Sequence, residues 1–159
     1  MTQRVDLATV MDRLAIDELI TGYAVAVDDA DWAAYRRLFT RDGRADYRSA
    51  GGIAGAADEV ADWLTGAMRL FPVRQHLIVN RRVRLEDLGG YPGDSADVLA
   101  DYVNPMRLDS GDGAEGTGGD FVSGGRYAFG LSRTDAGWRL RSVVVHEKWR
   151  RPPGALSSG

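Results

Sequence analysis

Apolar positions in the first third of the chain recur at the spacing of an α-helix. One face is made by Ile16, Leu19, Ile20, Tyr23 and Val27, which follow one another at helical intervals. The apolar residues of the preceding turns extend this face upstream: Leu7, Val10, Met11 and Leu14. The pattern predicts one helix over about residues 6–28. Asp31 is a favourable N-cap for a second, short helix, which carries Trp32, Tyr35, Leu38 and Phe39.

The pattern then changes twice before the middle of the chain. Asp42 and Gly43 are typical turn residues, and residues 44–49 alternate as in a short strand. A loop rich in glycine and alanine is expected over 51–57. A third helix follows, because its apolar residues share one face and Pro72 ends it. These residues are Val60, Trp63, Leu64, Ala67, Met68 and Phe71.

The second half of the chain has the period of extended strands. Four long strands are predicted over 74–86, 95–108, 121–133 and 138–149, and residues 134–137 read as the hairpin turn between the last two. The glycine-rich stretch 109–120 is expected to be a mobile loop. One domain is expected over residues 1–151, with a flexible tail over 152–159.

Helices followed by a run of strands predict an α+β fold. A sheet of four or five long strands needs cover on one face, so we expect the three helices to pack across the concave side of a curved, cone-shaped sheet. Such a cone leaves a pocket suited to a small molecule.

Composition removes several kinds of chemistry. The 159 residues include no cysteine and only two histidines, which excludes thiolate catalysis and a three-histidine metal site. The net charge of −3 gives no electrostatic case for nucleic acid or an anionic membrane surface. No apolar stretch approaches the roughly 20 residues of a membrane span. We expect a cytoplasmic protein with no cofactor and no metal.

Asp28 and Asp29 lie where the first predicted helix ends, next to the negative end of its dipole. They are either solvated turn residues, or one of them points into the pocket and orients a histidine. His76 stands on a predicted strand, sharing one face with Ile78 and Asn80. It is either a core or edge residue or the base of an acid–base pair. His146 lies beside Glu147 near the chain end, as in a surface ion pair.

Other polar and aromatic positions are candidates for the pocket wall. Tyr23, Tyr47, Tyr102 and Tyr127 lie on elements that should line the cone, and a buried phenol needs a hydrogen-bond partner. Each is either a core residue or a group that contacts substrate. Asn80 and Asn104 interrupt apolar strands, so each needs a partner if it is buried.

The order of these motifs along the chain resembles a SnoaL-like domain, a branch of the nuclear transport factor 2-like superfamily. The resemblance rests on the run from Tyr23 to Trp32, on residues 38–43, on Arg74 to Asn80, and on residues 125–149. Within that branch, residues 44–49 and 74–76 and the aspartate at position 28 are similar to the scytalone dehydratase-like group. That family is a cone-shaped α+β barrel that works without metal or organic cofactor.

The resemblance implies that Asp28 holds His76 and that Tyr47 helps to polarise a substrate carbonyl. Several family positions carry other residues here. Val27 replaces a tyrosine, the strand around Asn104 has no second histidine, and Tyr127 stands in place of an asparagine. The predicted substrate-binding residues are Tyr23, Val27, Trp63, Asn80, Asn104 and Tyr127.

These observations together predict a cofactor-independent lyase or isomerase of dehydratase type. Its expected substrate is a small, hydrophobic, cyclic or polyketide-like metabolite with a carbonyl group, and its catalytic residues are Asp28, His76 and Tyr47. Two alternatives remain: an aldol-type polyketide cyclase that uses the aspartate as base, and a non-catalytic module of the same fold that binds a small molecule. A homo-oligomer, dimer or trimer, is expected.

Overall fold

The computed structural model describes residues 6–86, 88–109 and 119–153. Its helices, including two short 3₁₀ turns called η1 and η2, are α1 (Leu7–Asp28), α2 (Trp32–Arg37), η1 (Arg48–Ala50), α3 (Ala57–Ala67) and η2 (Met68–Leu70). Its strands are β1 (Phe39–Asp46), β2 (Ala54–Ala56), β3 (Val73–Arg74), β4 (Leu77–Glu86), β5 (Ser95–Arg107), β6 (Asp120–Thr134) and β7 (Gly137–Arg151). The predicted α+β class is confirmed.

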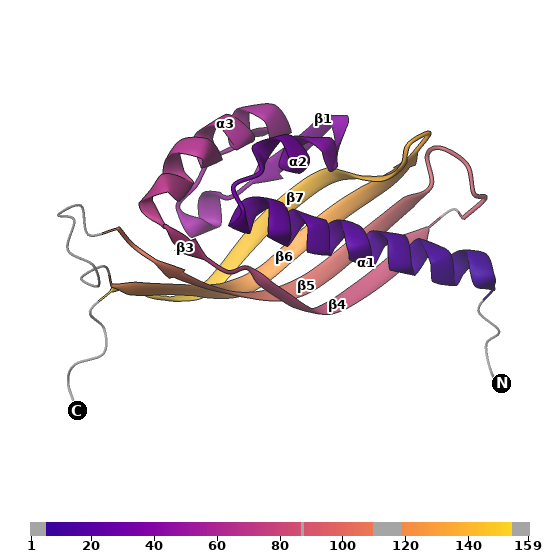
Figure 1. The fold of residues 1–159 in the computed structure, drawn as a ribbon. Helices are drawn as coiled ribbons and strands as arrows, with labels where there is room; N and C mark the ends of the chain where they lie inside the picture. The colour runs from indigo at the N-terminus through magenta and orange to yellow at the C-terminus, as the bar shows by residue number, and fades with distance from the viewer. Residues whose placement is uncertain (1–5, 87, 110–118, 154–159) are drawn as a thin grey trace.

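One seven-stranded sheet runs in the order β2-β1-β7-β6-β5-β3, and β4 also pairs with β5. All pairings are antiparallel except that of β1 with β7. Figure 1 shows α1 lying across one face of this curved sheet, with α2 and α3 beside it on the same side. The helices thus cover the concave face, as predicted, and leave the other face of the sheet open.

The core lies between α1 and the inner sides of the long strands. Alternation along β5 buries Ala96, Val98, Ala100 and Tyr102, because successive side chains point to opposite faces of a strand. The predicted face of α1 is buried from Ile16 onward. The predicted helix over about residues 6–28 is confirmed as α1. Its apolar face is not buried along the whole length, because Leu7, Val10, Met11 and Leu14 are all exposed.

The prediction fails between Leu38 and Tyr47. Phe39 begins strand β1 instead of continuing the helix, and Gly43 lies inside that strand instead of in a reversing turn. The register of β1 against β7 shifts between Phe39 and Arg44, which marks a bulge. A β-carbon on Gly43 would lie 2.9 Å from the Phe39 Cβ, so the chain curls too tightly there for a side chain. The strand ends at Asp46, and Tyr47 caps η1.

Two further differences shape the site. The predicted strand 74–86 is broken, because Gln75 and His76 lie between β3 and β4. The loop expected over 51–57 contains β2, which pairs with β1. By contrast, the hairpin turn at 134–137 is confirmed: Thr134 pairs with Gly137, whose φ of 94° suits glycine.

The expected mobile loop falls largely on residues 110–118, and most of the expected tail on residues 154–159; both ranges lie outside the described residues. The last strand continues to Arg151, two residues beyond its predicted end. Among the described residues, no helix is long and apolar enough to cross a bilayer.

Candidate active site

A pocket of about 330 Å³ opens between the inner face of the sheet and the helices. It is the hollow that contains His76. A wider depression of about 890 Å³ is lined by residues such as Arg84, Leu99 and Ser142; it holds neither histidine. The pocket walls are formed by Tyr23, Val27, Tyr47, Ala50, Gly51, Gly52, Trp63, Leu64, Ala67, Met68, Leu70, Phe71, His76, Tyr102, Asn104, Met106, Phe121, Ser123, Tyr127, Val145, Glu147 and Arg150.

Asp28 and His76 meet at the edge of this pocket, as the resemblance implied. The His76 Nδ1 lies 2.6 Å from the Asp28 Oδ1. The His76 backbone N–H also donates to the same carboxylate, at 3.0 Å and 2.9 Å from its two oxygens. The imidazole side chain is 8% exposed and the carboxylate 20%. Because an ionised carboxylate only accepts hydrogen bonds, Nδ1 carries the proton, and a neutral ring keeps its lone pair on Nε2.

The edge of the sheet makes this contact possible. Gln75 donates its backbone N–H to the Pro105 carbonyl of β5, and because neighbouring residues of an antiparallel strand direct their N–H groups to opposite sides, the His76 N–H faces away from β5, toward Asp28. The pair is therefore built from the end of α1 and the edge of the sheet between β3 and β4, segments 48 residues apart in sequence.

Three phenols form a second cluster against the pocket. The Tyr47 hydroxyl lies 2.6 Å from that of Tyr23 and 2.8 Å from that of Tyr35. Burial raises the pKa of Tyr47 and of Tyr23 well above the ordinary value, and it raises the pKa of Tyr35 to about 12. All three phenols are therefore protonated at neutral pH and can act as hydrogen-bond donors.

The three phenols carry one more hydroxyl proton than the hydrogen bonds between them use. Three hydroxyls carry three protons, and the two hydrogen bonds between them use two. Tyr35 is fully buried and does not line the pocket, so its proton is used on Tyr47. The remaining proton belongs to Tyr47 or Tyr23, which both line the pocket. This O–H is available to a ligand or to the neighbouring phenol of Tyr127, which also interacts with Tyr23.

A polar network that the sequence did not predict lies on the inner faces of β6 and β7. The Ser123 hydroxyl donates to the Glu147 carboxylate at 2.8 Å. The Arg150 guanidinium donates to both oxygens of that carboxylate, at 2.8 Å and 2.9 Å. The Tyr102 hydroxyl lies 3.4 Å from the Ser123 oxygen. Glu147 and Arg150 are three residues apart on β7, and only the register of the sheet shows that they face the pocket.

The other predicted substrate-binding residues divide into two groups. Val27, Trp63, Asn104 and Tyr127 line the pocket with Tyr23. Asn104 is 6% exposed, and its Oδ1 is buried with no hydrogen-bond partner among the described residues. An amide in this state is suited to accept a hydrogen bond from a ligand.

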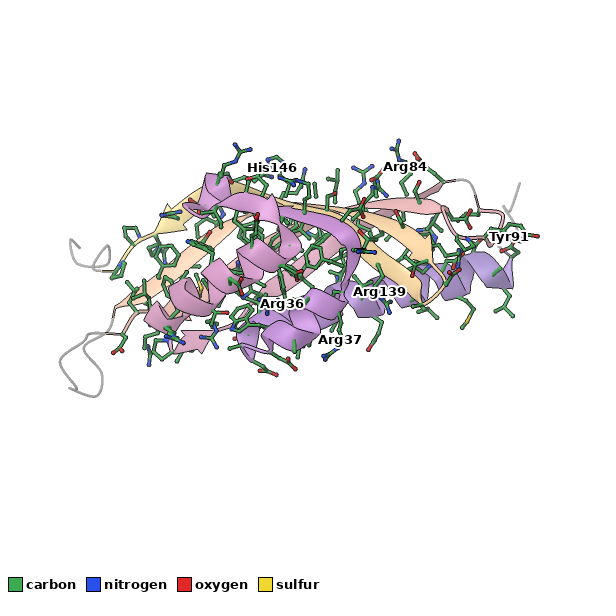
Figure 2. The ribbon with its side chains drawn as sticks, turned by 90° about the horizontal axis from the view of Figure 1, so that it is seen from above. Arg36, Arg37, Arg84, Tyr91, Arg139 and His146 are labelled. Atoms are coloured by element: carbon green, nitrogen blue, oxygen red, sulfur yellow. The ribbon has the colours of Figure 1, made fainter. Side chains whose placement is uncertain are left out.

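The predicted position of Asn80 is wrong. Its φ of 52° places it at a bulge of β4, where the side chain is exposed and bonds Asp101 at 3.3 Å. The bulge breaks the alternation that would have put Asn80 on the face of His76. His146 also lies outside the pocket: it is exposed and pairs in register with Arg126. Figure 2 shows it at the outer margin of the molecule, pointing away from the domain.

No metal centre is found in the described parts of the chain, where no three histidine, cysteine, aspartate or glutamate side chains are grouped to hold an ion.

Comparisons with known proteins agree with this architecture. A model of the SnoaL-like domain matches residues 8–144. The uncharacterized protein Rv2910c of Mycobacterium tuberculosis is 33% identical over 134 residues, which are 84% of each chain. A hexachlorocyclohexane dehydrochlorinase, LinA-type3 of Novosphingobium barchaimii, superposes with a TM-score of 0.75 at 18% identity, covering 96% of this chain and 97% of the other. A candidate scytalone dehydratase of Novosphingobium aromaticivorans gives 0.71 at 15% identity, with 94% and 96% covered.

Proposed function

Because the chain belongs to the SnoaL-like domain family and has the nuclear transport factor 2-like fold of a dehydrochlorinase and a candidate dehydratase, we propose that it is a cofactor-independent lyase or isomerase. Its substrate is a small cyclic or polyketide-like molecule with a carbonyl group. The observation that carries the proposal is the 2.6 Å contact between Asp28 and His76 at the wall of the pocket.

In the proposed reaction, Nε2 of neutral His76 removes a proton from the carbon next to the carbonyl. The electrons of that C–H bond form an enolate, whose oxygen accepts the free O–H of the phenol cluster. When the carbonyl re-forms, the C–O bond at the β carbon breaks, and His76 delivers its proton to the departing hydroxyl, which leaves as water. Delivery to another carbon instead gives an isomer. General acid–base help of this kind contributes roughly 10²–10⁴-fold.

The residues around the pair suit these steps. Asp28 fixes the imidazole tautomer and stabilises the imidazolium formed during the reaction. Tyr47 is the phenol nearest to the centre of its cluster and stabilises the enolate oxygen. The apolar side chains of Val27, Trp63 and Phe71 exclude water from the reacting atoms, which strengthens each of these interactions.

Two of the similar structures support an elimination, because one is named as a dehydrochlorinase and the other as a candidate dehydratase. Enzymes of both kinds remove a small molecule from neighbouring carbons. Two other functions fit the pocket: an aldol-type cyclase with Asp28 as base, and a non-catalytic module that binds a small molecule. Mass analysis identifies dehydration, which removes one water, whereas cyclisation, isomerisation and binding all leave the mass unchanged. A change in chromatographic retention at unchanged mass then separates cyclisation or isomerisation from a ligand that is only bound.

Proton abstraction can be tested before the natural substrate is known. Cyclohexanone and 3-hydroxycyclohexanone are incubated with the protein in heavy water, and NMR follows deuterium entering the position next to the carbonyl. We expect faster exchange than in buffer, and a loss of roughly 10²-fold or more in His76→Gln and Asp28→Asn. His146→Gln is the matched control, since it removes the other histidine from the outer face.

Equal exchange in the wild type and in His76→Gln would refute the proposed base. Ketones that bind, with no exchange beyond that in buffer, would favour the binding module.

A further inference from the structure

The C-terminal end of α1 lacks a cation of its own. The helix ends in Asp28 and Asp29, and its last turn contains no basic residue. Negative charge at this end is unfavourable because the helix dipole is negative there. The end that holds the proposed catalytic carboxylate therefore needs support from elsewhere.

Backbone hydrogen bonds satisfy only part of this helix end. Asp31 donates its N–H to the Ala26 carbonyl at 2.9 Å, and Ala30 donates to the Val27 carbonyl at 3.2 Å. With Ala30 at a φ of 54°, these bonds form a Schellman motif. The Asp28 carbonyl lies one position further on, and the chain turns away without supplying an N–H to it.

Arg74 donates hydrogen bonds to this carbonyl instead. Its Nε and Nη2 lie 3.2 Å and 2.9 Å from the Asp28 oxygen. The Nη1 of the same guanidinium donates to the carbonyls of Met68 and Phe71, at 3.0 Å and 2.8 Å. Arg74 thus brings a positive charge to the end of α1 and ties it to the segment that follows α3, where Met68 and Phe71 line the pocket.

The same segment of chain also carries His76, so two sets of bonds meet at one residue. The carbonyl oxygen of Asp28 accepts hydrogen bonds from Arg74, and its carboxylate accepts them from His76. Fixing the carbonyl fixes the backbone from which the carboxylate projects. A shift of the helix end by 1 Å would move the carboxylate out of line with Nδ1, and misplacements of that size cost enzymes about 10²-fold in rate.

We propose that Arg74 is a positioning residue: it locks the end of α1 and the end of η2 together so that the Asp28 carboxylate holds His76 in one tautomer. The inference rests on the proposed function. Arg74 makes no step of the reaction and acts through Asp28. Lysine cannot replace it fully, because a single ammonium does not present the planar fork that reaches three carbonyls at once.

Arg81 provides a matched control. Its guanidinium also ties α1 to the sheet, with bonds to the Asp17 carbonyl at 2.9 Å and to the Ile78 carbonyl at 3.3 Å. Its partner Asp17 lies more than two turns before Asp28 along the helix. Arg81→Gln removes a comparable clamp without touching the end of the helix.

The test is heteronuclear NMR of the His76 ring in a His146→Gln background, where His76 is the only histidine. With Arg74 present, we expect one tautomer and a low-field Nδ1 proton protected from exchange. In Arg74→Gln we expect that proton to be lost to exchange and both tautomers to appear, with an intermediate spectrum in Arg74→Lys. Arg81→Gln should lower thermal stability and leave the ring signals unchanged.

A purely structural role would give a different pattern. If Arg74→Gln and Arg74→Lys lower thermal stability as Arg81→Gln does, while the Nδ1 proton and the tautomer stay as in the wild type, the inference is wrong. If Arg74→Gln does not fold, unchanged ring signals in Arg74→Lys have the same meaning. The NMR signals need no turnover, so they test Arg74 even if exchange into ketones fails. Where exchange is observed, kcat should fall about 10²-fold in Arg74→Gln with a smaller change in KM.

Discussion

The buried phenol cluster allows a prediction in which a second mutation restores stability. Tyr47 is the only hydrogen-bond partner found for Tyr35 in the described structure, and Tyr35 is 0% exposed. Tyr47→Phe leaves the Tyr35 hydroxyl buried with no acceptor and no path to water. Tyr23 also loses a partner, but it lines the pocket and can be hydrated there.

The cost can be worked from these contacts. Leaving the Tyr35 hydroxyl unsatisfied in the interior costs roughly 1–3 kcal/mol, and exchanging the Tyr23 hydrogen bond for one to water costs about 1 kcal/mol. Tyr47→Phe should therefore destabilise the fold by about 2–4 kcal/mol, or about 4–16 °C in Tm for a chain of this size. Tyr35→Phe removes one bond and leaves Tyr47 paired with Tyr23, so we expect about 1 kcal/mol.

In Tyr35→Phe/Tyr47→Phe the orphaned hydroxyl is gone. The double variant should be more stable than Tyr47→Phe alone by about 1–3 kcal/mol, while deuterium exchange into ketones stays as low as in Tyr47→Phe. Urea unfolding of the four proteins measures this cycle. Additive destabilisation would refute the reasoning, because it would mean that Tyr35 finds another partner.

Three further predictions concern pH and assembly. Since burial raises the pKa of Tyr35 to about 12 from about 10 when unfolded, stability should be complete below about pH 10 and fall as pH rises toward 12, with phenolate absorbance appearing on unfolding. Burial raises the pKa of Asp94, but hydrogen bonds from the Gly90 N–H and from Arg133 outweigh it and hold that pKa below its ordinary value; stability should fall below about pH 4, and Asp94→Asn should flatten this dependence in urea titrations. Leu99 and Val103 are exposed on the open face of the sheet, so we expect light scattering to show a dimer or trimer that Leu99→Arg dissociates; an unchanged mass would exclude this face as the interface.

The sequence predicted those elements that local patterns determine. The helix around Leu64, the hairpin at residues 134–137 and the long strands β5 to β7 have periodicity and turn residues of their own. The stretch from Leu38 to Tyr47 does not. Its Asp42-Gly43 pair is a turn signal in most contexts, but here β7 supplies a parallel partner, and the pair becomes a bulge within a strand. Long-range pairing decided that outcome.

The site follows the same division. The sequence allowed Asp28 and His76 to be paired because the family resemblance places them together. The spacing between the two residues would not have predicted this contact. Arg74, Glu147 and Arg150 were missed as site residues because their roles depend on contacts across the fold. Arg74 binds carbonyls, which any sequence provides, and Glu147 faces the pocket only through the register of β7. Asn80 was misplaced because one bulge in β4 reverses which face its side chain takes.

With His146 on the outer face, the pocket holds a single imidazole, and this restricts the proposed reaction. The group that removes the proton is also the group that protonates the departing hydroxyl. An imidazole held at Nδ1 by Asp28 offers only Nε2 for both steps, so the C–H bond and the C–O bond that break must lie on the same side of the substrate. In the proposed reaction the phenol cluster binds the carbonyl oxygen at another part of the pocket wall. Syn elimination therefore follows from the proposed role of one histidine, whereas anti elimination would need a second acid. Glu147, the carboxyl group among the described residues that line the pocket, is bound on both oxygens by Arg150.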